Sequence, residues 1–179
     1  MGSTPMRRVA SLACAALAVV VLAGCGSESP GVVHLYDPVP VPAVPDRTAD
    51  LATPLADGQY WAPSVAVKDG QLVFQLGQAY FGPTCTSVLG VDACTDDFGE
   101  AHTLPAQVTL QPAGLTSVTV VDPQRRNYAI TGTELASLLG GAKPSTPAPA
   151  TYAYQPYPFL LTVLAGAVVE AHQIWLASM

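Results

Sequence analysis

The sequence predicts a mainly β protein, at the margin of the α+β class, that follows an export leader and a proline-rich linker. Three observations support this: short apolar runs with period two, Gly- and Pro-rich turns between them, and one segment patterned like a capped helix. The chain has 179 residues, of which 50% are hydrophobic and 11% charged. A chain of this length can bury a substantial core, so one small antiparallel β domain is expected rather than disorder.

Residues 1–24 have the composition of a signal peptide. Arg7 and Arg8 precede an apolar run from Val9 to Leu22, and small residues follow where a signal peptidase would cut. The run is short for a transmembrane helix. Either Met1 or Met6 can be the natural start, because both lie ahead of the arginines.

The leader ends in Leu22-Ala23-Gly24-Cys25, which resembles the lipobox of bacterial lipoproteins. The resemblance implies diacylglyceryl transfer to the Cys25 sulfur, cleavage after Gly24, and an N-terminal Cys25 that carries fatty acyl chains such as palmitate. It also implies a lipid-anchored protein on the extracytoplasmic face of the cell membrane, since two or three acyl chains anchor stably. The alternatives are an ordinary signal peptide with an incidental cysteine, or an uncleaved anchor.

Residues 25–56 have the composition of a tether that begins at the lipidated cysteine. Six prolines lie between Gly26 and Ala56, and no helical period is present, so extended conformations are expected. The run from Val32 to Tyr36 is apolar enough for this part of the segment to pack on the domain or pair with a sheet edge.

Residues 57–179 are expected to form the globular domain. The clearest hairpin joins strands at 60–67 and 72–79 through Asp69-Gly70, because this dipeptide readily adopts positive φ. Further strands are expected at 107–111, 116–121 and 127–130.

One short helix is expected after these strands. Thr131 can cap it while the Glu134 side chain returns a bond to the cap amide, and Gly140-Gly141 ends it. Its buried face would consist of Leu135, Leu138 and Leu139.

The C-terminal segment, residues 159–175, fits either two strands about Ala165-Gly166 or one buried helix. The hairpin is favoured, because the segment is rich in β-branched and aromatic residues and Gly166 lies where a turn needs it.

Cys85 and Cys94 are expected to form a disulfide, because oxidising compartments favour the bond. The alternative is a catalytic or metal-binding pair, but the chain contains no C-x-x-C and the spacing matches no common zinc motif.

The acidic residues around Cys94 form a dense cluster and a possible metal site, consisting of Asp92, Asp96, Asp97 and Glu100, with His102 beyond. Oxygen-rich clusters suit Ca²⁺, but an EF-hand fails here because its third and twelfth positions would be Cys94 and Thr103. The alternative is a solvated acidic loop. The sequence indicates no cofactor.

No catalytic motif is present: the chain lacks G-x-S-x-G, G-x-x-x-x-G-K-[ST], H-E-x-x-H and S-x-x-K. His102 could approach Asp97 or Glu100 as a base, whereas His172 is expected on a half-exposed strand face. Arg125-Arg126 is expected on a solvated turn. The sequence therefore favours a protein that is not an enzyme.

The aromatic residues can be either the core of a small β domain, which we favour, or a ligand platform. They are Tyr60, Trp61, Tyr80, Phe81, Tyr152, Tyr154, Tyr157 and Trp175. The net charge of −6 argues against nucleic acid as a partner.

Beyond the leader, the runs Ala-Tyr-Phe-Gly-Pro-Thr-Cys and Asp-Asp-Phe-Gly-Glu and the terminal Phe-Leu-Leu-Thr-Val are similar to uncharacterised secreted lipoproteins of actinobacteria. This resemblance implies an envelope location and no particular activity. Two function classes remain: a lipid-tethered binding module for a protein, peptide or cell-wall ligand, and an exported hydrolase or metal-dependent enzyme.

Overall fold

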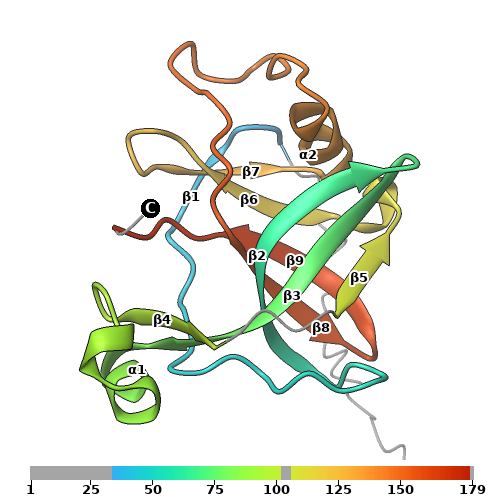
Figure 1. The fold of residues 1–179 in the computed structure, drawn as a ribbon. Coiled ribbons are helices and arrows are strands. Elements are labelled where there is room, and N and C mark those ends of the chain that lie inside the picture. Colours follow the sequence, from blue (N-terminus) through green and yellow to red (C-terminus); the bar gives the residue numbers. More distant parts are fainter. Residues whose placement is uncertain (1–33, 102–105, 178–179) are drawn as a thin grey trace, which may run out of the picture. The chain divides into compact units, whose positions relative to one another are not determined.

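Nine strands form one sheet in the part of the chain that the structure, a computed structural model, describes: residues 34–101 and 106–177. The order is β1-β7-β6-β9-β8-β2-β3-β4, with β5 also paired to β3 (Figure 1). The strands are β1 Pro38–Val39, β2 Gly58–Lys68, β3 Gln71–Phe81, β4 Phe98–Ala101, β5 Gln107–Leu110, β6 Ser117–Val121, β7 Asn127–Ile130, β8 Phe159–Leu164 and β9 Ala167–Gln173. All pairs are antiparallel except β6 with β9, so the mainly β prediction is confirmed.

Three tight turns explain much of this pairing, because both central residues of each have positive φ, as a two-residue hairpin turn requires. Asp69 and Gly70 (51° and 76°) join β2 to β3, and Ala165 and Gly166 (50° and 76°) join β8 to β9. The C-terminal hairpin is therefore confirmed. Asp96 and Asp97 (52° and 59°) form a third such turn before β4, closed by hydrogen bonds between Thr95 and Phe98.

The predicted helix, α2 (Gly132–Leu139), begins and ends where expected. The Thr131 hydroxyl accepts a hydrogen bond from the Glu134 amide at 3.2 Å, and Gly141 follows the helix with a φ of 82°. The returning half of the capping box is absent. The Glu134 carboxylate accepts hydrogen bonds from Tyr36 and Ser145 instead, because tertiary packing brings stronger donors to it.

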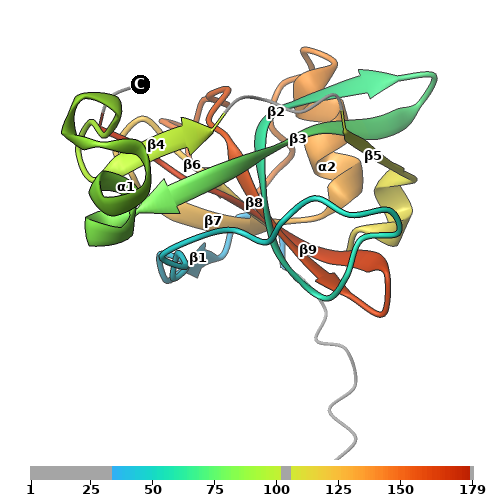
Figure 2. The same cartoon turned by 60° about the horizontal axis from the view of Figure 1, so that its bottom comes forward.

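A second α-helix, α1 (Gly82–Leu89), was not expected, so the prediction of one short helix is wrong. Pro83 lies in its first turn, where a missing N–H costs nothing. Only Cys85 of this helix is buried, so the sequence carries no amphipathic period that would reveal it. Figures 1 and 2 place α1 and α2 at opposite ends of the sheet. The 3₁₀ turns η1 (Val91–Ala93) and η2 (Pro112–Gly114) complete the elements.

The described part of the predicted tether, residues 34–56, packs on the domain. Tyr36 is 4% exposed, its amide donates to the Ala129 carbonyl at 2.7 Å, and β1 pairs with β7. The docking expected for the Leu35-Tyr36 region is confirmed, and the domain begins well before the expected boundary at residue 57. The predicted signal peptide and Cys25 lie outside the described residues.

The central strands bury side chains on both faces. Tyr60 and Trp61 are adjacent in β2 and point to opposite faces, yet both are fully buried. Tyr60 belongs to the larger core, which α2 covers through Leu135 and Leu138. Trp61 belongs to a smaller cluster of Ala79, Phe81, Leu160, Ile174 and Leu176, with Phe98 packed against it. Three residues of this second cluster, Phe81, Ile174 and Leu176, also line a cavity.

Candidate functional site

Residues 40–45, here called the strap, cross the molecule as an extended Pro-Val-Pro-Ala-Val-Pro continuation of β1. One end is held where β1 pairs with β7, and the other where the Phe81 amide donates to the Asp46 carbonyl at 2.9 Å. Across the described residues, no backbone hydrogen bond involves residues 40–45. Proline removes several of the donors. The strap is therefore anchored at its ends and held between them by side-chain contacts alone.

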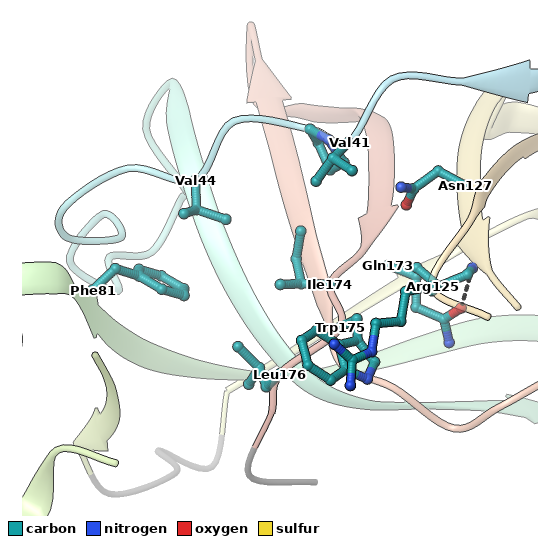
Figure 3. Close-up of a pocket in the computed structure, with 11 residues that line it drawn as sticks. Val41, Val44, Phe81, Arg125, Asn127, Gln173, Ile174, Trp175 and Leu176 are labelled. Atoms are coloured by element: carbon teal, nitrogen blue, oxygen red, sulfur yellow. Dashed lines mark hydrogen bonds between the residues drawn. The ribbon is translucent and has the colours of Figure 1, made fainter. Parts of the chain in front are cut away.

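A cavity of about 290 Å³, here called the strap cavity, lies beneath this segment (Figure 3). The strap supplies Val41, Pro42 and Val44, and the chain that leaves β9 supplies Ile174, Trp175 and Leu176. Its remaining lining residues are Phe81, Val121, Arg125, Asn127 and Gln173. The cavity is thus predominantly apolar, with a guanidinium and two side-chain amides at its edge, which is the usual character of a small-molecule site.

The turn between β6 and β7 positions Arg125 at the mouth of this cavity. Arg125 has a φ of 64°, a conformation that glycine usually supplies in such loops. The preceding Asp122 maintains the turn: its carboxylate accepts hydrogen bonds from the Gln124 and Arg126 amides, both at 2.9 Å. A non-glycine residue held at positive φ costs about 1 kcal/mol or more, and such strain is concentrated at functional sites.

The Arg125 guanidinium lies over the Trp175 ring, with its central carbon 3.6 Å from the ring centroid (Figure 3). The ion pairs of residues 34–101 and 106–177 are Arg47 with Asp50, Arg126 with Asp122, and His172 with Glu170. Within that part of the chain, no carboxylate neutralises Arg125. Arg125 therefore brings to the cavity a positive charge that no carboxylate of the described residues balances, in an acidic protein.

The two side-chain amides of the strap cavity differ in their hydrogen bonding. Gln173 is fully committed: its Oε1 accepts from the Val121 amide at 2.9 Å, and its Nε2 donates to the carbonyls of Gln155 and Tyr157. Asn127 is 6% exposed as a residue, and its side-chain amide makes no hydrogen bond to the described residues; it is not among the fully buried polar atoms without a partner, so it is accessible from the cavity. Figure 3 shows its amide end directed toward Val41, on the cavity side. Asn127 thus offers a free donor and acceptor to an occupant.

Asp122 supports the site electrostatically as well as sterically. Burial alone would raise the pKa of its carboxyl group, but hydrogen bonds from the Arg126 and Gln124 amides and from the Arg126 guanidinium outweigh burial and lower that pKa. The Arg126 Nε donates to it at 2.8 Å. Asp122 is therefore ionised at neutral pH and already neutralised by Arg126, which leaves Arg125 without a share of this carboxylate.

A second cavity, of about 420 Å³, shares Val41 and Pro42 of the strap with the first and includes His172. The His172 Nδ1 is 3.0 Å from the Thr119 hydroxyl oxygen, and its Nε2 is 3.4 Å from a Glu170 carboxylate oxygen. Thr119 and His172 are register partners on the parallel strands β6 and β9. A catalytic histidine would need a nucleophile beside it and N–H donors for an oxyanion. The strand amides near His172 are part of the sheet, so they are not available as such donors. The expected half-exposed strand position of His172 is consistent with its side-chain exposure of 20%.

The structure separates the residues of the predicted metal site. Asp92 is in η1, Asp96 and Asp97 form the turn before β4, and the Glu100 carboxylate accepts a hydrogen bond from the Trp61 indole. Across the described residues, no group of three or more His, Cys, Asp or Glu is arranged to hold a metal ion. The two consecutive aspartates serve the backbone conformation of the turn, since Asp tolerates positive φ. His102 lies outside the described residues.

The predicted disulfide between Cys85 and Cys94 is present, with the two Cα atoms 6.0 Å apart. It ties α1 to the segment before the Asp96-Asp97 turn. Gly99 passes against it so closely that a Cβ there would lie 2.7 Å from the Cys85 sulfur. The bond therefore organises the α1 region rather than supplying a reactive thiol.

Most of the aromatic residues form core, as favoured from the sequence: Tyr60, Trp61, Tyr80, Phe81 and Tyr152 are each at most 7% exposed. Trp175 differs from them in lining the strap cavity, where it contacts Arg125, a residue expected to be solvated on its turn. The turn itself is present. Sequence reasoning missed the Arg125–Trp175 contact because the two residues lie fifty positions apart along the chain.

No helix of residues 34–101 and 106–177 is long and apolar enough to cross a membrane. No protein-family model matches the sequence, and no curated protein and no solved structure matches it either.

Proposed function

We propose that this protein is a lipid-anchored extracytoplasmic lipoprotein whose domain binds a small, mainly apolar ligand in the strap cavity. The observation that carries the binding role is an apolar cavity bordered by the Asn127 amide and by the Arg125 guanidinium, which pairs with no carboxylate of the described residues. The lipobox resemblance of the leader supports the location.

The anchor would form at Cys25. The basic start, the apolar run and Leu22-Ala23-Gly24-Cys25 together supply what lipoprotein processing requires. We expect Cys25→Ala to accumulate as unprocessed precursor and mass spectrometry of the natural protein to detect an acylated N-terminal Cys25 peptide. A mature protein with an unmodified Cys25 would contradict the anchor.

The strap supports a binding role because it forms one wall of the cavity without backbone hydrogen bonds between its anchored ends. Moving such a segment breaks side-chain contacts only, whereas moving a sheet strand breaks its ladder. A ligand could therefore enter by local displacement of residues 40–45, since segments with few buried contacts open at low free-energy cost.

The binding role can be tested with the neutral, apolar fluorophore N-phenyl-1-naphthylamine, added to acylated protein in phospholipid vesicles with protein-free vesicles as background. We expect saturable fluorescence enhancement by the natural protein and at least a fivefold loss of affinity in Val41→Asp. Val41 lines the cavity and is 74% exposed, so its substitution should leave the fold intact.

Val91→Asp is the matched control, because Val91 is 72% exposed and lies in η1, outside the residues that line the cavity. It should bind the fluorophore as the natural protein does. Equal binding by both variants, or no saturable binding by the natural protein, would exclude the strap cavity as a ligand site.

The alternative is an exported hydrolase centred on His172, favoured by the Thr119–His172–Glu170 contacts. We rank it second, because Thr119 is only 6% exposed and the cluster has one carboxylate near the histidine. Hydrolysis of p-nitrophenyl acetate that His172→Gln abolishes would favour the enzyme. Identical background rates for both proteins would remove this alternative.

A further inference from the structure

We propose that the ligand of the strap cavity is an aliphatic carboxylate whose anionic head group pairs with Arg125 and whose single short alkyl chain occupies the space beneath the strap. This inference builds on the proposed binding role and specifies its chemistry. It assigns Arg125 as the residue that determines specificity for charge.

The Arg125 guanidinium supplies a positive charge at the strap cavity. Arg125 has no carboxylate partner in the described part of the chain, although the protein is acidic overall and the adjacent Arg126 has a close one in Asp122. Stacking over Trp175 at 3.6 Å restricts the guanidinium, and its N–H groups donate to no acceptor among residues 34–101 and 106–177. A planar guanidinium presented in this way is suited to a carboxylate.

The backbone supplies an independent argument. Arg125 occupies the position with φ of 64° at which glycine would avoid steric strain, and Asp122 maintains that conformation through two backbone amides. The strain is explained if the position directs the guanidinium to the cavity mouth.

The interior restricts the remainder of the ligand. The space is lined by valine, isoleucine, leucine and proline side chains, and about 290 Å³ is at the small end of the range for ligand sites. This volume suits one short alkyl chain. An extended peptide would need backbone partners, and the proline-rich strap provides few N–H groups for such pairing.

Asn127 is the second polar contact. The residue as a whole is 6% exposed, its side chain lines the cavity, and its amide atoms are not among the fully buried polar atoms that lack a partner in the described residues. An amide that faces the cavity can donate to and accept from a ligand head group. Gln173 is already saturated by protein groups, which leaves Asn127 as the amide available to a ligand.

The test compares octanoate with 1-octanol, which have the same alkyl length but differ in charge. Each is titrated into acylated protein in phospholipid vesicles, with displacement of N-phenyl-1-naphthylamine as the readout and protein-free vesicles subtracted. We expect the natural protein to bind octanoate at least tenfold more tightly than 1-octanol. Arg125→Gln should abolish this preference while leaving the affinity for 1-octanol within twofold.

Arg47→Gln is the matched control, because Arg47 is also a guanidinium near an aromatic ring, 5.8 Å from the Tyr80 centroid, but it pairs with Asp50. It should retain the preference for octanoate. Asn127→Asp provides a second, nearly isosteric test: the added negative charge should weaken octanoate binding at least tenfold and spare 1-octanol.

Three outcomes would overturn the proposal. The first is equal affinity of the natural protein for octanoate and 1-octanol, and the second is a preference for octanoate that survives Arg125→Gln. The third is tighter binding of a tripeptide that ends in leucine than of octanoate, because this result would identify a peptide C-terminus as the ligand. If 1-octanol displaces the fluorophore but octanoate has no advantage, the binding role stands and only the carboxylate is excluded. If neither compound nor fluorophore binds, the proposed function itself fails.

Discussion

Two adjacent arginines show how one turn can divide structural and functional roles between neighbouring residues. Arg126 neutralises the fully buried Asp122 carboxylate, with an N–O distance of 2.6 Å, and so belongs to the scaffold. Arg125 has strained backbone and a free guanidinium over Trp175, and so belongs to the proposed site. The two residues differ because the Arg126 guanidinium contacts the Asp122 carboxylate, whereas the Arg125 guanidinium contacts the Trp175 ring.

Asp122→Asn should lower the free energy of unfolding at pH 7 by about 2 kcal/mol, because it removes the charge that Arg126 and two backbone amides stabilise. The folded-state pKa of Asp122 is lowered from 3.8, so its contribution is present above that pH and is lost as the pH falls through the folded pKa. Urea unfolding from pH 7 to pH 2 should therefore show a gap between the two proteins that closes only under strongly acidic conditions.

Asp69→Asn is the control, since Asp69 is exposed in a turn at a φ of 51°, which Asn also tolerates. Its stability should match that of the natural protein at every pH. A gap for Asp122→Asn that persists unchanged at pH 2 would show that shape rather than charge accounts for the effect.

At the scale of elements, α2 is positioned by contacts that its sequence pattern does not reveal. Its first residue, Gly132, lies so close to η2 that a Cβ would be 2.3 Å from the Pro112 carbonyl oxygen and 2.9 Å from the Leu115 Cβ. The Gly132 amide also donates to the Leu115 carbonyl at 3.0 Å. Close backbone approach is therefore what glycine provides at this point, not positive φ.

Gly132→Ala should destabilise the protein by about 1–3 kcal/mol, although alanine is the better helix former, because the added methyl group forces the backbone apart. Denaturant unfolding would measure the change. Gly140→Ala, at the other end of α2, is the matched control: its Cβ would contact the nearest carbonyl oxygens at 3.4 Å and its φ is −74°. That variant should unfold within about 0.5 kcal/mol of the natural protein, with any gain attributable to lower unfolded-state entropy. Equal effects at both positions would contradict the close-approach argument.

For the whole molecule, the N-terminal segment is a structural part of the domain. Tyr36 packs edge-on against Tyr152, with ring centroids 5.0 Å apart, and its hydroxyl donates to the Glu134 carboxylate at 2.8 Å. Burial by itself would raise the pKa of Glu134, but hydrogen bonds from Ser145 and Tyr36 lower it, so this buried group is anionic at neutral pH. Three distant segments therefore meet at one carboxylate: the N-terminal segment, α2 and the loop after it.

Tyr36→Phe should lower the free energy of unfolding by about 1.5–3 kcal/mol at pH 7, the usual value for a hydrogen bond to a charged group. It should also increase amide hydrogen exchange in β1, because β1 would be held mainly by its short pairing with β7. Tyr80→Phe removes a hydroxyl bonded at 3.0 Å to the uncharged Gln78 side chain and should cost clearly less. Equal stabilities for the two variants would show that the Glu134 contact does not hold the segment.

Several features of the fold could be predicted from the preferences of residues that are close together in the sequence. The Asp69-Gly70 and Ala165-Gly166 turns, the Thr131 cap and the Cys85–Cys94 disulfide all follow from residues close together in the chain, whose preferences act over a few bonds. The sequence by itself thus determined the mainly β class, two hairpins and the helix α2, and it predicts the leader and the anchor.

Only the tertiary structure decided the site. The strap cavity combines residues near 41, 125 and 175, the parallel pairing of β6 with β9 joins strands fifty residues apart, and Glu134 bonds Tyr36 rather than its own cap. The position of helix α1 also depends on residues outside it, because its one buried residue, Cys85, is bonded to Cys94. Such contacts depend on which surfaces meet after folding, and no periodicity or motif in one segment encodes its distant partner. The sequence therefore determined the elements, whereas long-range packing determined where a ligand could bind.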